Sequence, residues 1–143
     1  MYKLSASNQI PGTVAAVKEG AVNGVVTLDT AAGFVKADIS MEAIRELGLR
    51  EGADATAVIN ACDVLLREDE PCGYSCSAGN AFVGEVASLT PGAVSAIACI
   101  KVAGDIELTS NMELECADAL GLKPGVGVLV VVSSNDVLVS CEG

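Results

Sequence analysis

Short segments of serine, asparagine, glycine and alanine occur twice in this 143-residue chain, in the same order. The first copy has Ser5-Ala6-Ser7-Asn8 and then Gly20-Ala21-Val22; the second has Ser77-Ala78-Gly79-Asn80 and then Gly92-Ala93-Val94. Hydroxyl, amide and backbone N–H groups that converge from such loops can bind a small anion. The same polar side chains can instead satisfy a turn that enters a strand, and each Gly-Ala-Val can be a hairpin whose glycine needs positive φ. Both interpretations stay open from the residues alone.

The two copies are related by a constant offset that places Gly12 on Gly84 and Val14 on Val86. The register then slips by one, and Leu47-Gly48-Leu49 matches Leu120-Gly121-Leu122, so one residue is inserted in a loop or strand end. A tandem duplication follows. We expect domain 1 over residues 1–69 and domain 2 over 70–143, with an acidic, Pro- and Gly-containing linker at about 68–75.

Hydrophobic periodicity predicts the same elements in each repeat. In the first repeat, strands are expected over 9–18, 22–29, 35–39, 53–60 and 64–66. Ser40 offers an N-cap and Gly48 a C-terminal glycine for a short helix between the third and fourth strands. This order predicts a mainly β chain of two tandem OB-like five-stranded Greek-key barrels, each with one short helix. Because such small barrels are filled by side chains, a ligand would bind in their loops or between barrels.

Charge and composition limit the partners. Eight basic residues against nineteen acidic ones give a net charge of −11, which argues against nucleic acid and against an anionic membrane surface. No apolar run approaches the roughly 20 residues that span a bilayer, and no secretory signal is visible, so a cytoplasmic location is expected. Half of the residues are apolar. Since repeats of about 70 residues form only marginal cores, we expect burial between subunits, in a homo-oligomer.

Residues suited to catalysis or to a metal cation are scarce. There is no histidine, no paired nucleophile and base, and no phosphate loop of the Walker type, so the chain is not expected to be an enzyme. The six cysteines do not fall on one another between repeats, and Cys72 and Cys76 have the wrong spacing for a zinc or redox pair. We expect unpaired thiols and no direct protein ligands to a metal cation.

Several separated motifs, in the right order twice, carry a resemblance to a known family. These are Ser5-Ala6-Ser7-Asn8-Gln9 with Pro11-Gly12, Glu19 to Asn23, Glu46 to Leu49 with Glu51-Gly52, and Ala57 to Val64. They resemble the Mop (TOBE-type) molybdate-binding domain, and two copies in tandem are similar to the di-domain molbindins. The resemblance implies OB-like barrels around a three-fold axis, in a trimer, with molybdate or tungstate bound between domains. It implies storage or buffering of the oxyanion, with no organic cofactor.

The resemblance also implies which segments bind the oxyanion. They are Ser5, Ala6, Ser7, Asn8, Gly20, Ala21, Val22, Asn60, Ala61 and Cys62 in the first repeat, and Ser77, Ala78, Gly79, Asn80, Gly92, Ala93, Val94, Ser133 and Ser134 in the second. The family usually carries Arg third in its first motif and Lys in its last strand. Here Ser7 and Asn60, and then Gly79 and Ser133, occupy those places.

Two alternatives stay open. The segments Asn60-Ala61-Cys62 and Ser133-Ser134-Asn135 could equally be polar breaks between two strands. The chain could also be an oligomeric OB-fold module that has lost oxyanion binding or binds another small ligand.

Overall fold

The computed structural model describes residues 8–68 and 79–141. Within these residues, each repeat contains five strands, one α-helix and one or two 3-10 helices. The first repeat has β1 (Asn8–Lys18), β2 (Asn23–Thr30), β3 (Gly33–Ser40), α1 (Met41–Glu46), β4 (Asp54–Ile59), η1 (Ala61–Asp63) and β5 (Leu65–Glu68). The second has β6 (Gly79–Pro91), β7 (Ser95–Lys101), η2 (Ala103–Asp105), β8 (Glu107–Glu113), α2 (Leu114–Ala119), β9 (Gly127–Ser133), η3 (Ser134–Asp136) and β10 (Leu138–Ser140). The predicted element order is therefore confirmed.

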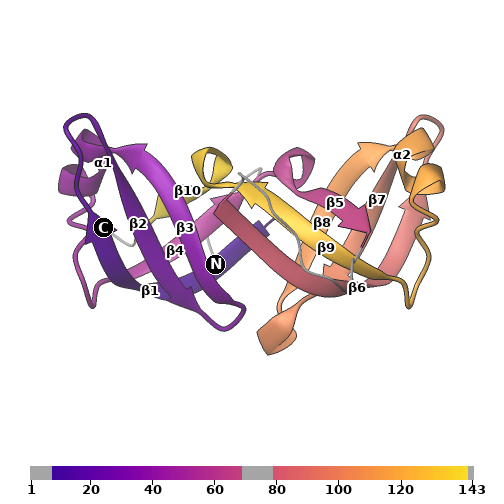
Figure 1. The fold of residues 1–143 in the computed structure, drawn as a ribbon, viewed down its shortest axis with the longest axis horizontal. Helices are drawn as coiled ribbons and strands as arrows, with labels where there is room; N and C mark the ends of the chain where they lie inside the picture. The colour runs from indigo at the N-terminus through magenta and orange to yellow at the C-terminus, as the bar shows by residue number, and fades with distance from the viewer. Residues whose placement is uncertain (1–7, 69–78, 142–143) are drawn as a thin grey trace.

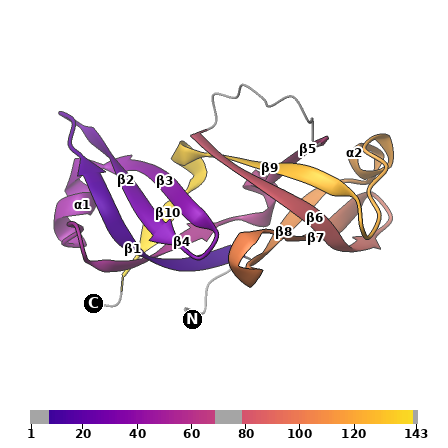
Figure 2. The same cartoon turned by 60° about the horizontal axis from the view of Figure 1, so that its bottom comes forward.

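The strands form two curved antiparallel sheets that lie side by side along the long axis of the molecule (Figures 1 and 2). The long first strand of each repeat bends so that it can pair with two neighbours. β1 pairs with β4 through its first half and with β2 through its second half, and its register shifts between Val14 and Ala16. β6 has the equivalent shift between Val86 and Ser88. Such bulges increase local twist and curve a strand, which gives each sheet its barrel-like form.

The last strand of each repeat belongs to the sheet of the other repeat. The strand orders are β10-β4-β1-β2-β3 and β5-β9-β6-β7-β8. Leu65 of β5 pairs with Val131 of β9, and Leu138 of β10 pairs with Val58 of β4. The sequence led us to expect that each repeat would complete its own sheet, and the structure differs on this point. The predicted linker lies almost wholly outside the described residues, so the boundary between residues 69 and 70 stays a prediction.

The hydrophobic core is continuous across both sheets. One cluster of buried side chains includes Ile10, Leu28 and Val35 of the first repeat with Ile100 and Leu108 of the second. Val64 and Val137, which precede the two exchanged strands, are 2% and 0% exposed. Burying one valine side chain stabilises a fold by about 1.5 to 3 kcal/mol relative to leaving it exposed. Each repeat therefore buries apolar surface against the other as well as within itself.

The inserted residue that the repeat alignment predicted lies in the connection between β7 and β8. In the first repeat, Thr30 pairs with Gly33 across a turn of two residues. In the second, Lys101 pairs with Glu107 and the longer connection contains η2. Gly104 and Asp105 there have φ of 71° and 59°. Left-handed backbone of this kind favours glycine, and the extra residue is accommodated in this loop without a change in either strand.

Candidate functional site

The polar segments of each repeat meet near the middle of the molecule. Asn8, the first residue of β1, pairs with Ile59, and Asn60-Ala61-Cys62 follows directly. In the second repeat Gly79 pairs with Ser133 across β6 and β9. The structure thus brings the first and last predicted motifs of each repeat together. Ser5, Ala6, Ser7, Ser77 and Ala78 lie outside the described residues.

The side chains of Asn8 and Asn80 bind backbone groups of the opposite repeat. The Nδ2 of Asn80 donates to the carbonyl oxygen of Lys36 at 2.8 Å, and its Oδ1 accepts from the Lys36 N–H at 2.7 Å. Asn8 forms the same pair of hydrogen bonds with Thr109, at 2.9 and 2.7 Å. Both asparagines are 3% exposed. Each carboxamide therefore caps the outer edge of β3 or β8 as a neighbouring strand would, which favours a structural role for these two side chains.

A side chain at Gly79 would be strained. Its φ is 97°, and a Cβ built there would lie 3.3 Å from Cβ and 3.4 Å from Oγ of Ser134. An L-residue is strained at this φ, and the contact is tighter than ordinary van der Waals packing. This is the place where the family pattern carries arginine. The second repeat therefore has glycine in place of that arginine, and the backbone conformation at this position also disfavours any larger residue.

The last motifs of the two repeats differ in their hydrogen bonds. Ser133 Oγ accepts a hydrogen bond from the N–H of Asn135 at 3.3 Å and caps η3. Asn60 holds the equivalent place before η1, but its side chain forms no capping hydrogen bond, and it is exposed. Ser134 is half-buried beside Gly79 and aligns with the half-buried Ala61, whereas the exposed Cys62 aligns with the exposed Asn135. The first repeat thus presents the exposed amide of Asn60 where the second has the partly covered hydroxyl of Ser133.

The two Gly-Ala-Val turns lie at the far ends of the molecule, away from these motifs (Figure 1). The carbonyl oxygen of Val22 accepts a hydrogen bond from Met41 N–H at 2.8 Å, and that of Val94 accepts from Leu114 N–H at 2.9 Å. Each turn is therefore held against the start of a helix. The valine side chains are 75% and 80% exposed. Within one chain the structure does not bring these turns to the other predicted motifs.

Glycine is required in these turns for a different reason from the one we expected. Neither Gly20 nor Gly92 is among the residues with positive φ. A Cβ at Gly92 would lie 2.9 Å from the carbonyl oxygen of Ser95, and one at Gly20 would meet that of Asn23. Close approach of the backbone to itself, and not left-handed backbone, excludes a side chain.

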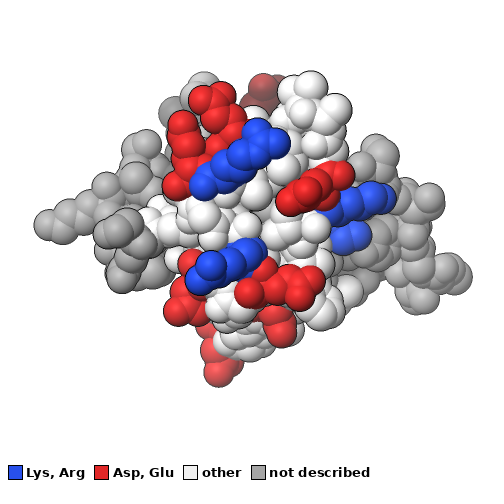
Figure 3. Space-filling view, turned by 90° about the vertical axis from the view of Figure 1, so that its left-hand side faces the viewer, with Lys and Arg blue, Asp and Glu red and all other residues white. Residues whose placement is uncertain are grey.

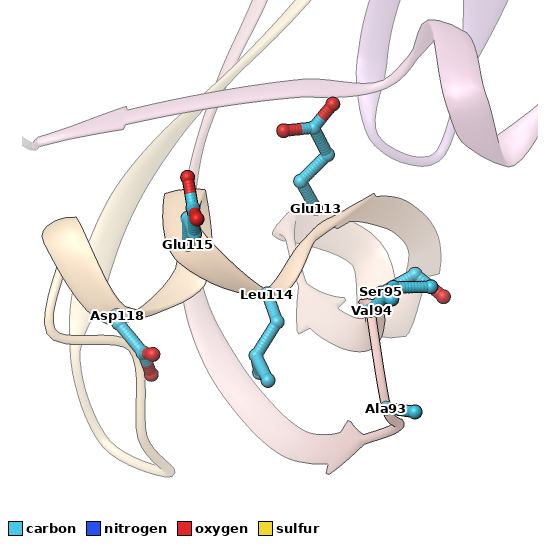
Figure 4. A pocket seen from close by; sticks show the side chains of 7 residues that line it. All are labelled: Ala93, Val94, Ser95, Glu113, Leu114, Glu115 and Asp118. Carbon is cyan, nitrogen blue, oxygen red and sulfur yellow. The ribbon is translucent and has the colours of Figure 1, made fainter.

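An open depression lies between the second turn and α2. It is lined by Ala93, Val94, Ser95, Glu113, Leu114, Glu115 and Asp118. In Figure 4 the side chains of Leu114 and Asp118 point to the lower side of α2, the side on which the turn at Ala93 also lies, whereas those of Glu113 and Glu115 point upward. Of the three carboxylates that line the depression, only that of Asp118 therefore lies on the same side of α2 as the turn, which is one of the segments that the resemblance assigned to an oxyanion.

The corresponding end of the first repeat carries charges of both signs. Figure 3 looks onto this end and shows basic side chains interleaved with acidic ones. Glu42, Arg45 and Glu46 of α1 and Arg50 beyond it are all exposed. Arg45 aligns with Asp118 because the register of residues 47–49 on 120–122 applies through both helices. Our sequence interpretation did not include this pair, although the internal alignment already contains the charge reversal.

The described cysteines are unpaired, and two have a raised pKa. Burial, then the hydrogen bond from its Sγ to Oε2 of Glu107 at 3.5 Å and the charge of that carboxylate, raises the pKa of Cys99. Burial raises the pKa of Cys141. Both thiols are therefore less nucleophilic at neutral pH than a free cysteine. Cys62 and Cys116 are exposed, and Cys72 and Cys76 lie outside the described residues.

Neither a metal-binding cluster nor a membrane-spanning helix is found in the described parts of the chain. No group of three or more His, Cys, Asp or Glu side chains is placed there to hold a metal ion. Neither six-residue α-helix, nor any other helix in residues 8–68 and 79–141, is long and apolar enough to cross a membrane.

The sequence matches a known domain twice. The profile of the TOBE domain matches residues 4–66 and 76–139. The chain belongs to the TOBE domain family. Its fold confirms this: the structure aligns with a crystal structure of the cytoplasmic molybdate-binding protein ModG, with molybdate bound, at a TM-score of 0.93. That alignment covers 99% of this chain and 100% of ModG, at 37% sequence identity. The resemblance and the fold class predicted from the sequence are both confirmed.

Further relatives match both repeats of this chain or one of them. The molybdenum transport protein ModE of Herbaspirillum seropedicae is 33% identical over 141 residues, which are 98% of this chain and 52% of ModE. The chain thus spans about half the length of that relative. Molybdenum-pterin-binding protein 3 of Clostridium pasteurianum is 45% identical over 64 residues, which are 44% of this chain and 94% of that protein. One TOBE domain of this chain therefore corresponds to nearly all of that small protein.

Proposed function

We propose that this chain binds molybdate or tungstate and acts as an intracellular store or buffer of the oxyanion. The observation that carries the proposal is the similarity to molybdate-bound ModG, which extends over the whole of both chains. The relative that shares both repeats is described as a molybdenum transport protein, and the one that shares a single repeat as a molybdenum-pterin-binding protein. Segments rich in Ser, Gly, Ala and Asn supply backbone N–H and hydroxyl donors, which suit a tetrahedral dianion.

The site is completed by a second copy of the chain. In each repeat the first and last motifs lie near the middle of the molecule, and the Gly-Ala-Val turns lie at its ends (Figures 1 and 2). One molecule therefore cannot surround a small anion with all of them. The highly exposed Val22 and Val94 at the turn tips are suited to burial against another copy. We infer a homo-oligomer, a trimer by the family resemblance, with oxyanion sites at interfaces between domains.

The proposed contacts are those implied by the resemblance, refined by the structure. Because the carboxamides of Asn8 and Asn80 bind the opposite repeat, these residues would contribute their backbone and not their side chains. Hydroxyls and backbone N–H groups at residues 5–8 and 77–80 would act with those at 60–62 and 133–134. The turns at 20–22 and 92–94 would come from a neighbouring copy. Domain 1 would comprise residues 1–69 and domain 2 residues 70–143.

The partners, the absence of catalysis and the location are proposed on the net charge, the binding role and the description of ModG. The net charge of −11 opposes nucleic acid and anionic membranes as partners. A store needs reversible binding and no reaction, so we propose that the chain is not an enzyme and uses no organic cofactor. ModG is described as cytoplasmic, and we propose the same location here.

A second candidate is an assembly module that keeps the fold without the ligand. It is favoured by the absence of the family's Arg and Lys at Ser7, Asn60, Gly79 and Ser133. Charge-assisted hydrogen bonds are about twice as strong as neutral ones, so their loss weakens an anion site. The same uncharged site could also take another small ligand.

Metal content distinguishes the candidates. Protein purified from cells fed molybdate or tungstate should contain molybdenum or tungsten in proportion to protein, and calorimetry should detect both oxyanions binding to the metal-free protein. Sulfate serves as the control anion. If neither metal copurifies and neither oxyanion binds, the store is rejected and the assembly module remains.

A further inference from the structure

We propose that the residue at the turn-facing position of each helix, Arg45 in α1 and Asp118 in α2, decides which repeat's turn can contact the oxyanion. The first repeat's Gly20-Ala21-Val22 turn would accept the anion, and the second repeat's Gly92-Ala93-Val94 turn would repel it. This inference rests on the proposed oxyanion function. It narrows the turn contacts proposed above from both turns to residues 20–22, and it makes the two repeats unequal binding partners within one chain.

The two positions are equivalent in the structure. Both helices have six residues and follow directly on the third strand of their repeat. Their first residues donate to the valine of the turn through the same backbone hydrogen bond, Met41 to Val22 and Leu114 to Val94. A residue five positions into the helix therefore has the same relation to its turn in each repeat. That residue is a cation in the first repeat and an anion in the second.

Asp118 lines the same depression as the second turn. It lines that depression together with Ala93 and Val94, and Figure 4 shows its carboxylate on the side of α2 that carries Leu114. Like charges repel, and the repulsion of a dianion is twice that of a monoanion at the same distance. Lys18 and Glu19 precede the first turn, and their counterparts before the second turn are the neutral Thr90 and Pro91. These two positions add no net charge difference, so the difference between the turns rests on Arg45 and Asp118.

An independent feature of the second repeat agrees with this. Gly79, at the family's arginine position, has φ of 97° and lies against Ser134, so no cationic side chain fits there without strain. Both ends of the second repeat therefore lack positive charge next to a candidate anion contact. The first repeat keeps Arg45 in α1, and Ser7, the counterpart of Gly79, lies outside the described residues.

Two charge reversals test the inference by calorimetry with molybdate on the full chain. Arg45→Asp should weaken molybdate binding about tenfold. An exposed ion pair strengthens binding by up to about fivefold, and this substitution changes the charge beside the dianion by two units. Asp118→Arg should leave the original sites intact and add binding at the second turn, seen as a higher stoichiometry or as affinity raised about tenfold.

Matched controls keep the net charge change constant. Arg50→Asp repeats the first change just beyond α1. Glu115→Arg repeats the second on the side of α2 that points away from the turn, at a position where the first repeat has the identical residue, Glu42. Both controls should stay within about twofold of the original affinity at physiological salt, where exposed charges are screened. Circular dichroism and light scattering verify that every variant keeps its fold and assembly.

The outcomes separate this inference from the function on which it rests. If the original chain binds molybdate but Arg45→Asp has no more effect than Arg50→Asp, or Asp118→Arg no more than Glu115→Arg, the inference is wrong and the store remains. If neither the original chain nor any variant binds molybdate or tungstate, the proposed function fails and the inference falls with it.

Discussion

Gly104 of the second repeat lies directly against Ala31 of the first. A Cβ built on Gly104 would stand 2.6 Å from the carbonyl carbon and 2.8 Å from the Cβ of Ala31. The loop that contains the inserted residue therefore touches the β2–β3 turn of the other repeat. Because Gly104 also has φ of 71°, both backbone conformation and space require glycine where the two hairpin tips meet.

The substitution Gly104→Ala should destabilise the protein by about 2 to 4 kcal/mol, since it combines left-handed strain with a clash between the repeats. Gly48→Ala is the matched control, because Gly48 has φ of 63° and a Cβ added there would have nothing within 4 Å. It should cost only the conformational part, about 1 to 2 kcal/mol. Chemical denaturation measures both. Equal losses would show that the contact with Ala31 contributes nothing.

Replacing Asn80 with alanine removes two hydrogen bonds and leaves the N–H and carbonyl of Lys36 without their partner. Unfolding free energy should fall by about 2 to 4 kcal/mol. Asn111→Ala, at an exposed position of β8, should change it by less than about 0.5 kcal/mol. Guanidinium titrations of the three proteins provide the measurement. A small effect at Asn80 would mean that water replaces the carboxamide at the edge of β3.

Cutting the chain between the repeats should not separate them. A protease site inserted between residues 70 and 75 would yield two fragments that each hold a strand of the other's sheet. They should coelute in native buffer and separate only in denaturant. Either fragment expressed alone lacks the strand that the other fragment contributes to its sheet, and it should be unfolded or self-associated. Two fragments that fold and migrate independently would contradict the exchanged arrangement.

Restoring the family's cations should help only in the first repeat. Ser7→Arg with Asn60→Lys should tighten molybdate binding by about 1 to 3 kcal/mol if each side chain forms one charge-assisted hydrogen bond. Gly79→Arg should instead lower stability, by about 1 to 2 kcal/mol from its φ of 97° alone. Calorimetry and thermal unfolding report the two effects. No gain in affinity from the double variant would remove these positions from the proposed site.

The sequence predicted the strands and helices correctly, but it did not predict which strands pair with each other. Periodicity and the cap residues Ser40 and Gly48 locate the strands and helix, and Ser40 Oγ accepts from Ala43 N–H at 3.1 Å as an N-cap does. No comparable residue in the sequence indicates that β5 and β10 are exchanged between the sheets. A strand's alternation specifies which face is buried and not which sheet edge it joins, and β5 and β10 both begin with an exposed leucine.

The candidate site was harder to predict for a related reason. Asn8 and Asn80 were singled out because they recur, but repetition accompanies a structural clamp as well as a ligand contact. Distinguishing the two requires knowing that Thr109 and Lys36 present unpaired edges nearby, which depends on how the repeats pack. In the same way, Gly20 and Gly92 were correctly identified as turn residues, while the close backbone approach that requires them is a property of the folded turn.

The exchange of β5 and β10 also bears on how the chain folds as it is synthesised. The ribosome produces β1 to β4 early, but the edge of β4 pairs with β10, after the entire second repeat has emerged. Until then that edge carries unpaired backbone groups, which neighbouring nascent chains can pair with. Pairings so distant in sequence also form slowly. We therefore expect that the nascent first repeat needs a chaperone or a slow translation rate. The reason would be the exposed edge of β4, which stays unpaired until β10 is synthesised, more than the core of the first repeat itself.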